Sequence, residues 1–167
     1  MTNLLKRGFT LIELLVVISI IGILTALITT NLQGARIRAR DARRKGDLQA
    51  ISQSLRLYYT DHQGFPGSTS EVINGCGDLG TDPCSWGGAF RKNANTIYMG
   101  SLPEDPSSTT TTPAYYKYYS TNGNSFTLVA TLENLSDTAI TESQTRCANS
   151  LNGHTLVTAT DYIVCAE

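Results

Sequence analysis

Glu13 is the only charged residue in a run of about twenty mostly apolar residues from Phe9 to Ile28. A carboxylate in such a run opposes entry into a bilayer, by about 2.5 to 3.5 kcal/mol near the centre and by less toward the interface. Two interpretations follow. Glu13 either reaches up to the lipid headgroups, or it is a functional acid that needs a cationic partner.

Four cysteines form the second set of reactive side chains. All lie beyond residue 70 and none shows Cys-x-x-Cys spacing, which favours disulfides made in an oxidising compartment over metal binding. This places the C-terminal part of the chain outside the cytoplasm. Four cysteines allow three pairings. Because neighbours in sequence close small loops, we expect Cys76 to pair with Cys84 and Cys147 with Cys165, the second bond tying the C-terminus to its domain.

The chain offers little for catalysis. His62 and His154 are isolated, and no spacing fits a zinc site, a nucleophile elbow or a phosphate-binding glycine loop. We therefore expect a protein that is not an enzyme, with no metal site and no cofactor.

One long helix must position Glu13. The apolar run is long enough to cross a bilayer, and Lys6 and Arg7 stand just before it. Beyond it, Leu48, Ile51, Leu55 and Tyr58 recur at the three- and four-residue spacing of an amphipathic helix. No proline interrupts the first 65 residues. The pattern predicts a helix from about residue 9 to about residue 61, ended by the Gly-Phe-Pro sequence at 64–66.

Charge is distributed unevenly around a net value of −1. A basic collar holds six cations, and residues 46–167 hold five basic and twelve acidic residues. The collar consists of Arg36, Arg38, Arg40, Arg43, Arg44 and Lys45. It could be a solvated or headgroup-facing helix, a contact between subunits, or a DNA-binding surface, in that order of preference. The pairs Asp41–Lys45 and Arg43–Asp47 have i,i+4 spacing, which supports the first interpretation.

The remaining chain predicts a small antiparallel sheet. Residues 64–113 are rich in turn formers and are expected to be mostly loop, pinned by Trp86 and Phe90. Strands are expected over 115–121 and 125–132, joined by a type I′ turn at Asn122-Gly123, and a third over 155–164. The fold class is α+β: a long N-terminal helix, membrane-spanning in its first half, with about three strands packed on its outer half.

The segment Lys6-Arg7-Gly8-Phe9-Thr10-Leu11-Ile12-Glu13-Leu14 resembles the class III leader of type IV prepilins and type II secretion pseudopilins. The resemblance implies a membrane peptidase that cuts after Gly8 and methylates the new N-terminal Phe9. It also implies that Glu13 meets the Phe9 amine of a neighbouring subunit. The expected domains are a leader (1–8), a transmembrane and polymerisation helix (9–30), an amphipathic outer half (31–63) and an extracytoplasmic globular domain (64–167).

Residues 58–66 and 102–106 add a weaker resemblance to major pseudopilins. Such proteins commonly bind calcium, but Asp137, Glu142 and Asp161 are too scattered here to form one loop of oxygen ligands. The resemblance implies a structural subunit of a type IV pilus or type II secretion pseudopilus. The alternatives are a minor or competence pilin whose domain binds DNA or a surface ligand, and a membrane-anchored protein that never polymerises.

The same resemblance implies the partners and the location. The expected partners are identical or related subunits, the prepilin peptidase, the inner-membrane assembly platform with its motor, and membrane lipid before assembly; nucleic acid is the least favoured. We expect a single-pass membrane protein that later enters a surface pilus or an envelope pseudopilus.

Overall fold

The first element is a helix of 52 residues, α1, Leu11–His62. The computed structural model describes residues 9–109, 111, 116–155 and 159–166, without the side chains of residues 27–31. The chain divides into two compact units, residues 1–37 and 38–167, each considered by itself. In the first unit, every described side chain from Phe9 to Ala26 is exposed.

The expected membrane span of residues 9–30 is tested only in part. Among the residues whose placement is described, no helix is both long enough and apolar enough to cross a membrane. Residues 27–30 of the expected span are not among them, because their side chains are not described.

In the second unit, α1 buries the face that its spacing predicts. Leu48, Ile51 and Leu55 are completely buried, and Tyr58 is nearly so. The helix ends at His62, close to the expected residue. Gln63, rather than Gly64, takes the left-handed conformation that ends it, with φ of 54°, and its N–H donates to the Tyr59 carbonyl at 2.8 Å.

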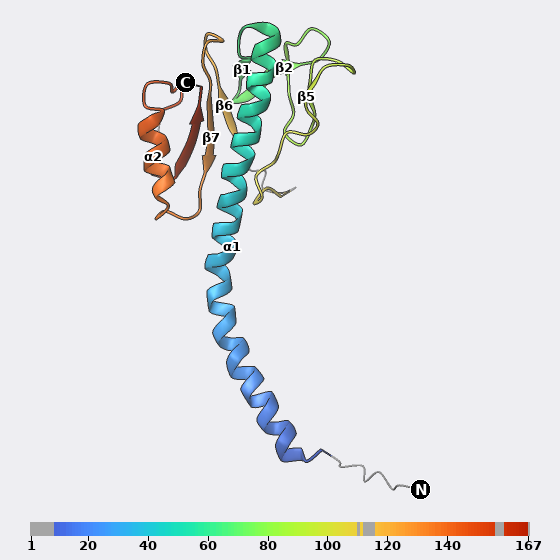
Figure 1. Cartoon of the computed structure of the whole chain (residues 1–167), viewed down its shortest axis with the longest axis vertical. Helices are drawn as coiled ribbons and strands as arrows, with labels where there is room; N and C mark the ends of the chain where they lie inside the picture. The colour runs from blue at the N-terminus through green and yellow to red at the C-terminus, as the bar shows by residue number, and fades with distance from the viewer. Residues whose placement is uncertain (1–8, 110, 112–115, 156–158, 167) are drawn as a thin grey trace. The chain divides into compact units, whose positions relative to one another are not determined.

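The predicted three-stranded sheet is confirmed among the described residues; residues 115 and 156–158 of the expected strands lie outside them. It contains β6 (Lys117–Tyr119), β7 (Thr127–Thr131) and β8 (Asp161–Cys165), all antiparallel in the order β6-β7-β8. One face of the sheet joins the buried residues of α1 in a single core, and Figure 1 shows the strands beside that helix. The alternating residues expected on this face are all buried: Phe126, Leu128, Ala130 and Leu132.

The expected type I′ turn at Asn122-Gly123 is wrong. Because Tyr119 pairs with Thr127, a seven-residue loop, 120–126, joins β6 to β7. Gly123 does take a positive φ of 72°, but its carbonyl accepts a 2.7 Å hydrogen bond from the Phe65 N–H. A contact with the residues after α1 thus replaces the two-residue hairpin.

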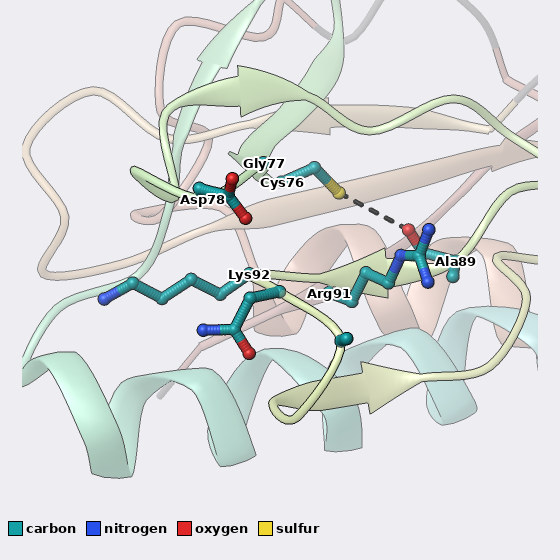
Figure 2. Close-up of a pocket in the computed structure, with 8 residues that line it drawn as sticks. Cys76, Gly77, Asp78, Ala89, Arg91 and Lys92 are labelled. Atoms are coloured by element: carbon teal, nitrogen blue, oxygen red, sulfur yellow. Dashed lines mark hydrogen bonds between the residues drawn. The ribbon is translucent and has the colours of Figure 1, made fainter.

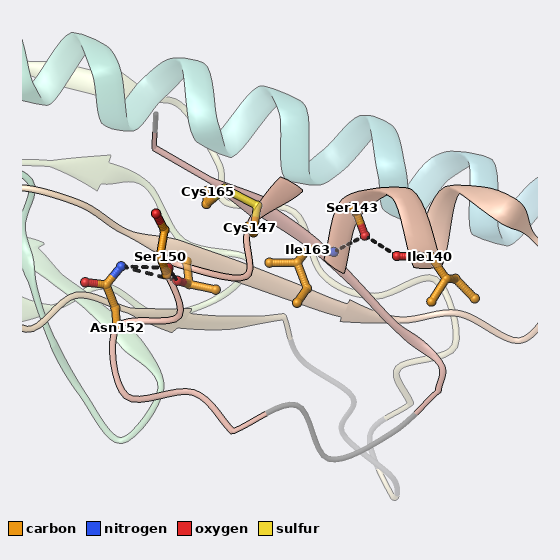
Figure 3. The surroundings of a disulfide bond; sticks show 8 residues. Ile140, Ser143, Cys147, Ser150, Asn152, Ile163 and Cys165 are labelled. Atoms are coloured by element: carbon orange, nitrogen blue, oxygen red, sulfur yellow. Dashed lines mark hydrogen bonds between the residues drawn. A yellow bond between two sulfur atoms is a disulfide. The ribbon is translucent and has the colours of Figure 1, made fainter. Parts of the chain in front are cut away.

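A second helix that the sequence did not predict, α2 (Thr138–Arg146), packs beside β8, the edge strand of this sheet. The Ile163 N–H donates to Ser143 Oγ at 3.1 Å, and the Gln144 amide donates to the Asp161 carbonyl at 2.9 Å. These bonds satisfy part of the free edge of β8. Directly after the helix, Cys147 is bonded to Cys165 of the same strand (Figure 3).

Residues 64–113 contain two small sheets that the sequence did not predict. The first has β1 (Gly67–Thr69), β2 (Val72–Cys76) and β3 (Asp82–Pro83), and the second has β4 (Phe90–Arg91) and β5 (Ile97–Met99). Cys76 is bonded to Cys84, so both cysteine pairs are those that the sequence led us to expect. Phe90 is completely buried and Trp86 packs edge-on against Tyr116, as expected of residues that pin this region.

We predict that Cys147→Ala with Cys165→Ala lowers the free energy of unfolding by about 3 kcal/mol, because the unfolded chain regains the entropy of the loop that the bond closes. Chemical denaturation of the full chain would measure the loss. The matched control, Cys76→Ala with Cys84→Ala, opens a shorter loop and should lose about 2.5 kcal/mol. A loss below about 1 kcal/mol for the first pair would contradict the prediction.

Candidate assembly segment and buried ion pairs

Thr10 and Glu13 form a reciprocal cap at the start of α1. The Thr10 N–H and hydroxyl donate to Glu13 Oε2 at 2.9 and 2.8 Å, and the Glu13 N–H donates to Thr10 Oγ1 at 3.2 Å. This is the capping-box arrangement, in which the two residues satisfy each other's backbone N–H groups. The Thr-x-x-Glu spacing signals such a box in the sequence, and our sequence analysis overlooked it.

The cap fixes Glu13 within its own chain and engages only one carboxylate oxygen. Both bonds from Thr10 reach Oε2, whereas Oε1 has no hydrogen-bond partner among the described residues. Phe9 is 80% exposed just before the helix, and Gly8 lies outside the described residues. The single chain thus presents a half-satisfied carboxylate next to the expected new N-terminus.

The second cluster is centred on Arg44, whose side chain is only 2% exposed. Its guanidinium contacts three carboxylates: Nη1 lies 2.6 Å from Asp41 Oδ1, Nε 2.7 Å from Asp105 Oδ2, and Nη2 2.7 Å from Glu133 Oε1. Asp41 in turn accepts the backbone N–H groups of Glu133 and Asn134 at 3.0 and 2.8 Å. These bonds join α1 to two loops that are distant in sequence.

Three cations of the basic collar are therefore used inside the domain. Besides Arg44, Arg40 pairs with Glu133, and Lys45 Nζ lies 2.7 Å from Asp137 Oδ2. The solvated or headgroup-facing interpretation of the whole collar is wrong for these three. These pairs also weaken the case for a DNA-binding surface.

The two expected i,i+4 pairs of the collar have different outcomes. The Arg43–Asp47 pair is present, at 3.7 Å. The Asp41–Lys45 pair is absent, because Asp41 binds Arg44 and Lys45 binds Asp137. Asp41 thus pairs at i,i+3 on the same helix, and Lys45 pairs with a residue outside α1.

The ion pairs lower the pKa values of their acids. The hydrogen bond from Arg40, supported by Arg44, lowers the pKa of Glu133 to about 2. Burial would raise the pKa of Asp105, but the hydrogen bonds from Arg44 and Ser107 outweigh it and hold that pKa below its usual value. The hydrogen bond from Lys45 likewise lowers the pKa of Asp137. All three acids favour the charged form in the folded state.

Other residues of interest in the sequence make hydrogen bonds and ion pairs that stabilise the fold. Asp137 caps α2 through the Ala139 N–H at 3.0 Å, and its second oxygen binds Lys45, so this carboxylate is already engaged. Tyr116 and Tyr118 are buried, and their hydroxyls donate to Asp47 at 2.7 Å and to the Pro66 carbonyl at 2.6 Å. These two tyrosines of the expected strand over 115–121 thus belong to the core.

The arrangement defines a type IV pilin-like protein: a long N-terminal helix with an exposed apolar start, capped at its first acid and carrying a small disulfide-bonded α+β domain. Comparison with known proteins agrees. Residues 4–29 match the prokaryotic N-terminal methylation motif. No solved structure matches the chain significantly.

Curated relatives narrow the class. The chain is 33% identical over 102 residues to type II secretion system core protein G of Escherichia coli, covering 60% of this chain and 66% of the relative. It is 38% identical to the protein of the same name from Pseudomonas aeruginosa, covering 60% and 68%. The match to the Dickeya chrysanthemi protein, at 35% identity, covers 63% of that relative. The chain thus spans between 63% and 68% of the length of these three relatives. The chain belongs to the type II secretion core protein G family.

We predict that Arg44→Met lowers the free energy of unfolding by about 3 to 5 kcal/mol, because it leaves buried carboxylates without their cation. The matched control is Arg43→Met on the same helix, where the arginine side chain is 63% exposed. The control should change stability by less than about 0.5 kcal/mol. Equal effects of the two substitutions, measured by denaturant unfolding, would contradict the prediction.

Acid should destabilise the domain in a defined range. The folded pKa of Glu133, about 2, lies below its ordinary value of 4.5, so its stabilising effect is complete above about pH 4.5 and disappears as the pH falls through about 2. Asp105 and Asp137 act in the same direction. Between pH 6 and pH 2 the thermal unfolding temperature should fall less for Glu133→Gln than for the wild-type chain. Identical pH profiles would disprove this assignment.

Proposed function

We propose that this chain is a structural subunit that polymerises through its N-terminal helix into the pseudopilus of a type II secretion system. The supporting observation is the exposure of every described side chain from residue 9 to residue 26, including Leu11 at 80% and Ile12 at 74%. Such apolar surface is stable only in lipid or against other subunits. Family membership then favours a pseudopilus over other filaments.

Before assembly, residues 9–30 reside in the cell membrane with the disulfide-bonded domain outside the cytoplasm. The prepilin peptidase removes residues 1–8 and methylates Phe9. An assembly platform and its motor then transfer the subunit from lipid into the filament. The role proposed for the chain is mechanical and not catalytic, since its reactive side chains serve caps, ion pairs and disulfides.

Within the filament, Glu13 pairs with the Phe9 amine of a neighbouring subunit. The capping box supports this step, because it holds the carboxylate in place and leaves Oε1 for an incoming cation. An α-amino group is cationic near neutral pH and stays basic when methylated. In apolar surroundings each charge would be costly alone, so their pairing favours docking.

Glu13→Gln tests this function while preserving the cap, because glutamine can also take the third helical position of a capping box. We expect normal cleavage before Phe9, shown by N-terminal peptide mass spectrometry, but few filaments on cells or in sheared fractions. Removing the charge also makes membrane insertion easier, so lost filaments could not be attributed to poor insertion.

Thr10→Val serves as the matched control, because it removes the hydroxyl that makes two of the three capping hydrogen bonds and retains the Glu13 charge. It should reduce filament yield less than Glu13→Gln. Wild-type filament yield from cells that make only Glu13→Gln at normal levels would refute the charge pairing. Failure of the wild-type chain to enter any filament would refute the proposed function.

A further inference from the structure

A polar groove on the globular domain lies between the outer half of α1 and the end of β8. Its volume is about 380 Å³, and it is lined by Gln49, Ser52, Gln53, Arg56, Arg146, Val164 and Cys165. The four residues from α1 recur at three- and four-residue spacing and so share one face of that helix. All of the lining residues belong to the second compact unit.

The groove has two cations and no acid in its wall. Arg56 and Arg146 are both exposed, and neither forms an ion pair with any residue that the structure describes. They differ in this from Arg40, Arg44 and Lys45, which acids of the same domain neutralise. Two guanidinium groups in one groove favour an anion, and a carboxylate fits their paired donors well.

A second cavity has cations that form no ion pair among the described residues, but it also has an acid in its lining. Figure 2 shows Asp78 together with Arg91 and Lys92 around a cavity of about 290 Å³. Two cations and one acid line this cavity, so an anion that entered it would meet the Asp78 carboxylate as well as the two cations. Of these two cavities, the groove at Arg56 is the one whose described lining has cations and no acid.

The rest of the domain is acidic and supplies a natural counterpart. Residues 46–167 contain twelve acidic and five basic residues, so two copies brought together repel each other unless opposite charges meet. Asp78, Asp82 and Glu104 are exposed, and none forms an ion pair within the described chain. A neighbouring copy therefore presents free carboxylates to the groove.

We propose that the groove between Arg56 and Arg146 is a subunit contact that binds a carboxylate from the acidic surface of a second copy of this chain. The proposal rests on the proposed function, because the filament is what brings copies together. It adds a contact between globular domains to the one made by the N-terminal helices. Like other exposed charge contacts, it sets the orientation of neighbours as well as contributing affinity.

The test is filament yield from the full chain in cells that carry the secretion machinery. Arg56→Glu with Arg146→Glu should lower the yield on the order of tenfold, because like charges placed opposite each other suppress association. Cleavage before Phe9 and formation of both disulfides should be unchanged, which separates lost assembly from misfolding. Arg91→Glu, the same charge change at an exposed site outside the groove, should keep the yield within about twofold of wild type.

A second charge reversal identifies the partner residue. Every copy in a filament carries both the groove and the acidic surface, so both changes can be made in one chain. In the Arg56→Glu, Arg146→Glu background, either Asp78→Arg with Asp82→Arg or Glu104→Arg should restore filaments. Normal yield from the groove variant, or a loss that neither reversal restores, would overturn the proposal. If neither the wild-type chain nor the Arg91→Glu control formed filaments, the proposed function itself would fail, and this contact with it.

Discussion

The buried guanidinium of Arg44 is the interaction on which the attachment of the domain to its helix depends. It holds Asp105 and Glu133, while the adjacent Asp41 binds the backbone at residues 133 and 134. A buried ion pair adds little net stability compared with apolar packing, but it is costly to break. Its consequence here is therefore positional: the two loops can approach α1 only where their carboxylates meet one arginine.

The surroundings of α1 change along its length, and this change separates its two roles. From Leu48 to Tyr58 its apolar residues form the core with the sheet. From Phe9 to Ala26 comparable apolar residues have no covering within the chain. The same physical property, apolar surface, is thus removed from water in one part, where it stabilises the domain, and is exposed in the other.

Much of this architecture could be predicted from local sequence patterns. Helical spacing predicted the buried face of α1, and alternation predicted the core face of β7. The partners of Arg44 could not be predicted, because Asp105 and Glu133 lie 61 and 89 residues away. The loop before β7 depends on a contact with Phe65. For α2, polar composition and a length of nine residues gave only a weak periodic signal.

Glu13 shows how the structure changes a choice posed by the sequence. A lone carboxylate in an apolar helix seemed to require either headgroup contact or a partner on another chain. The capping box provides a third arrangement, because Thr10 donates two hydrogen bonds to one oxygen of the same carboxylate. The cost of keeping Glu13 in apolar surroundings is reduced but not removed, since hydrogen bonds from neutral groups leave its charge unneutralised. A cation that reaches the second oxygen removes the remaining cost, so the cap favours pairing with a partner instead of competing with it.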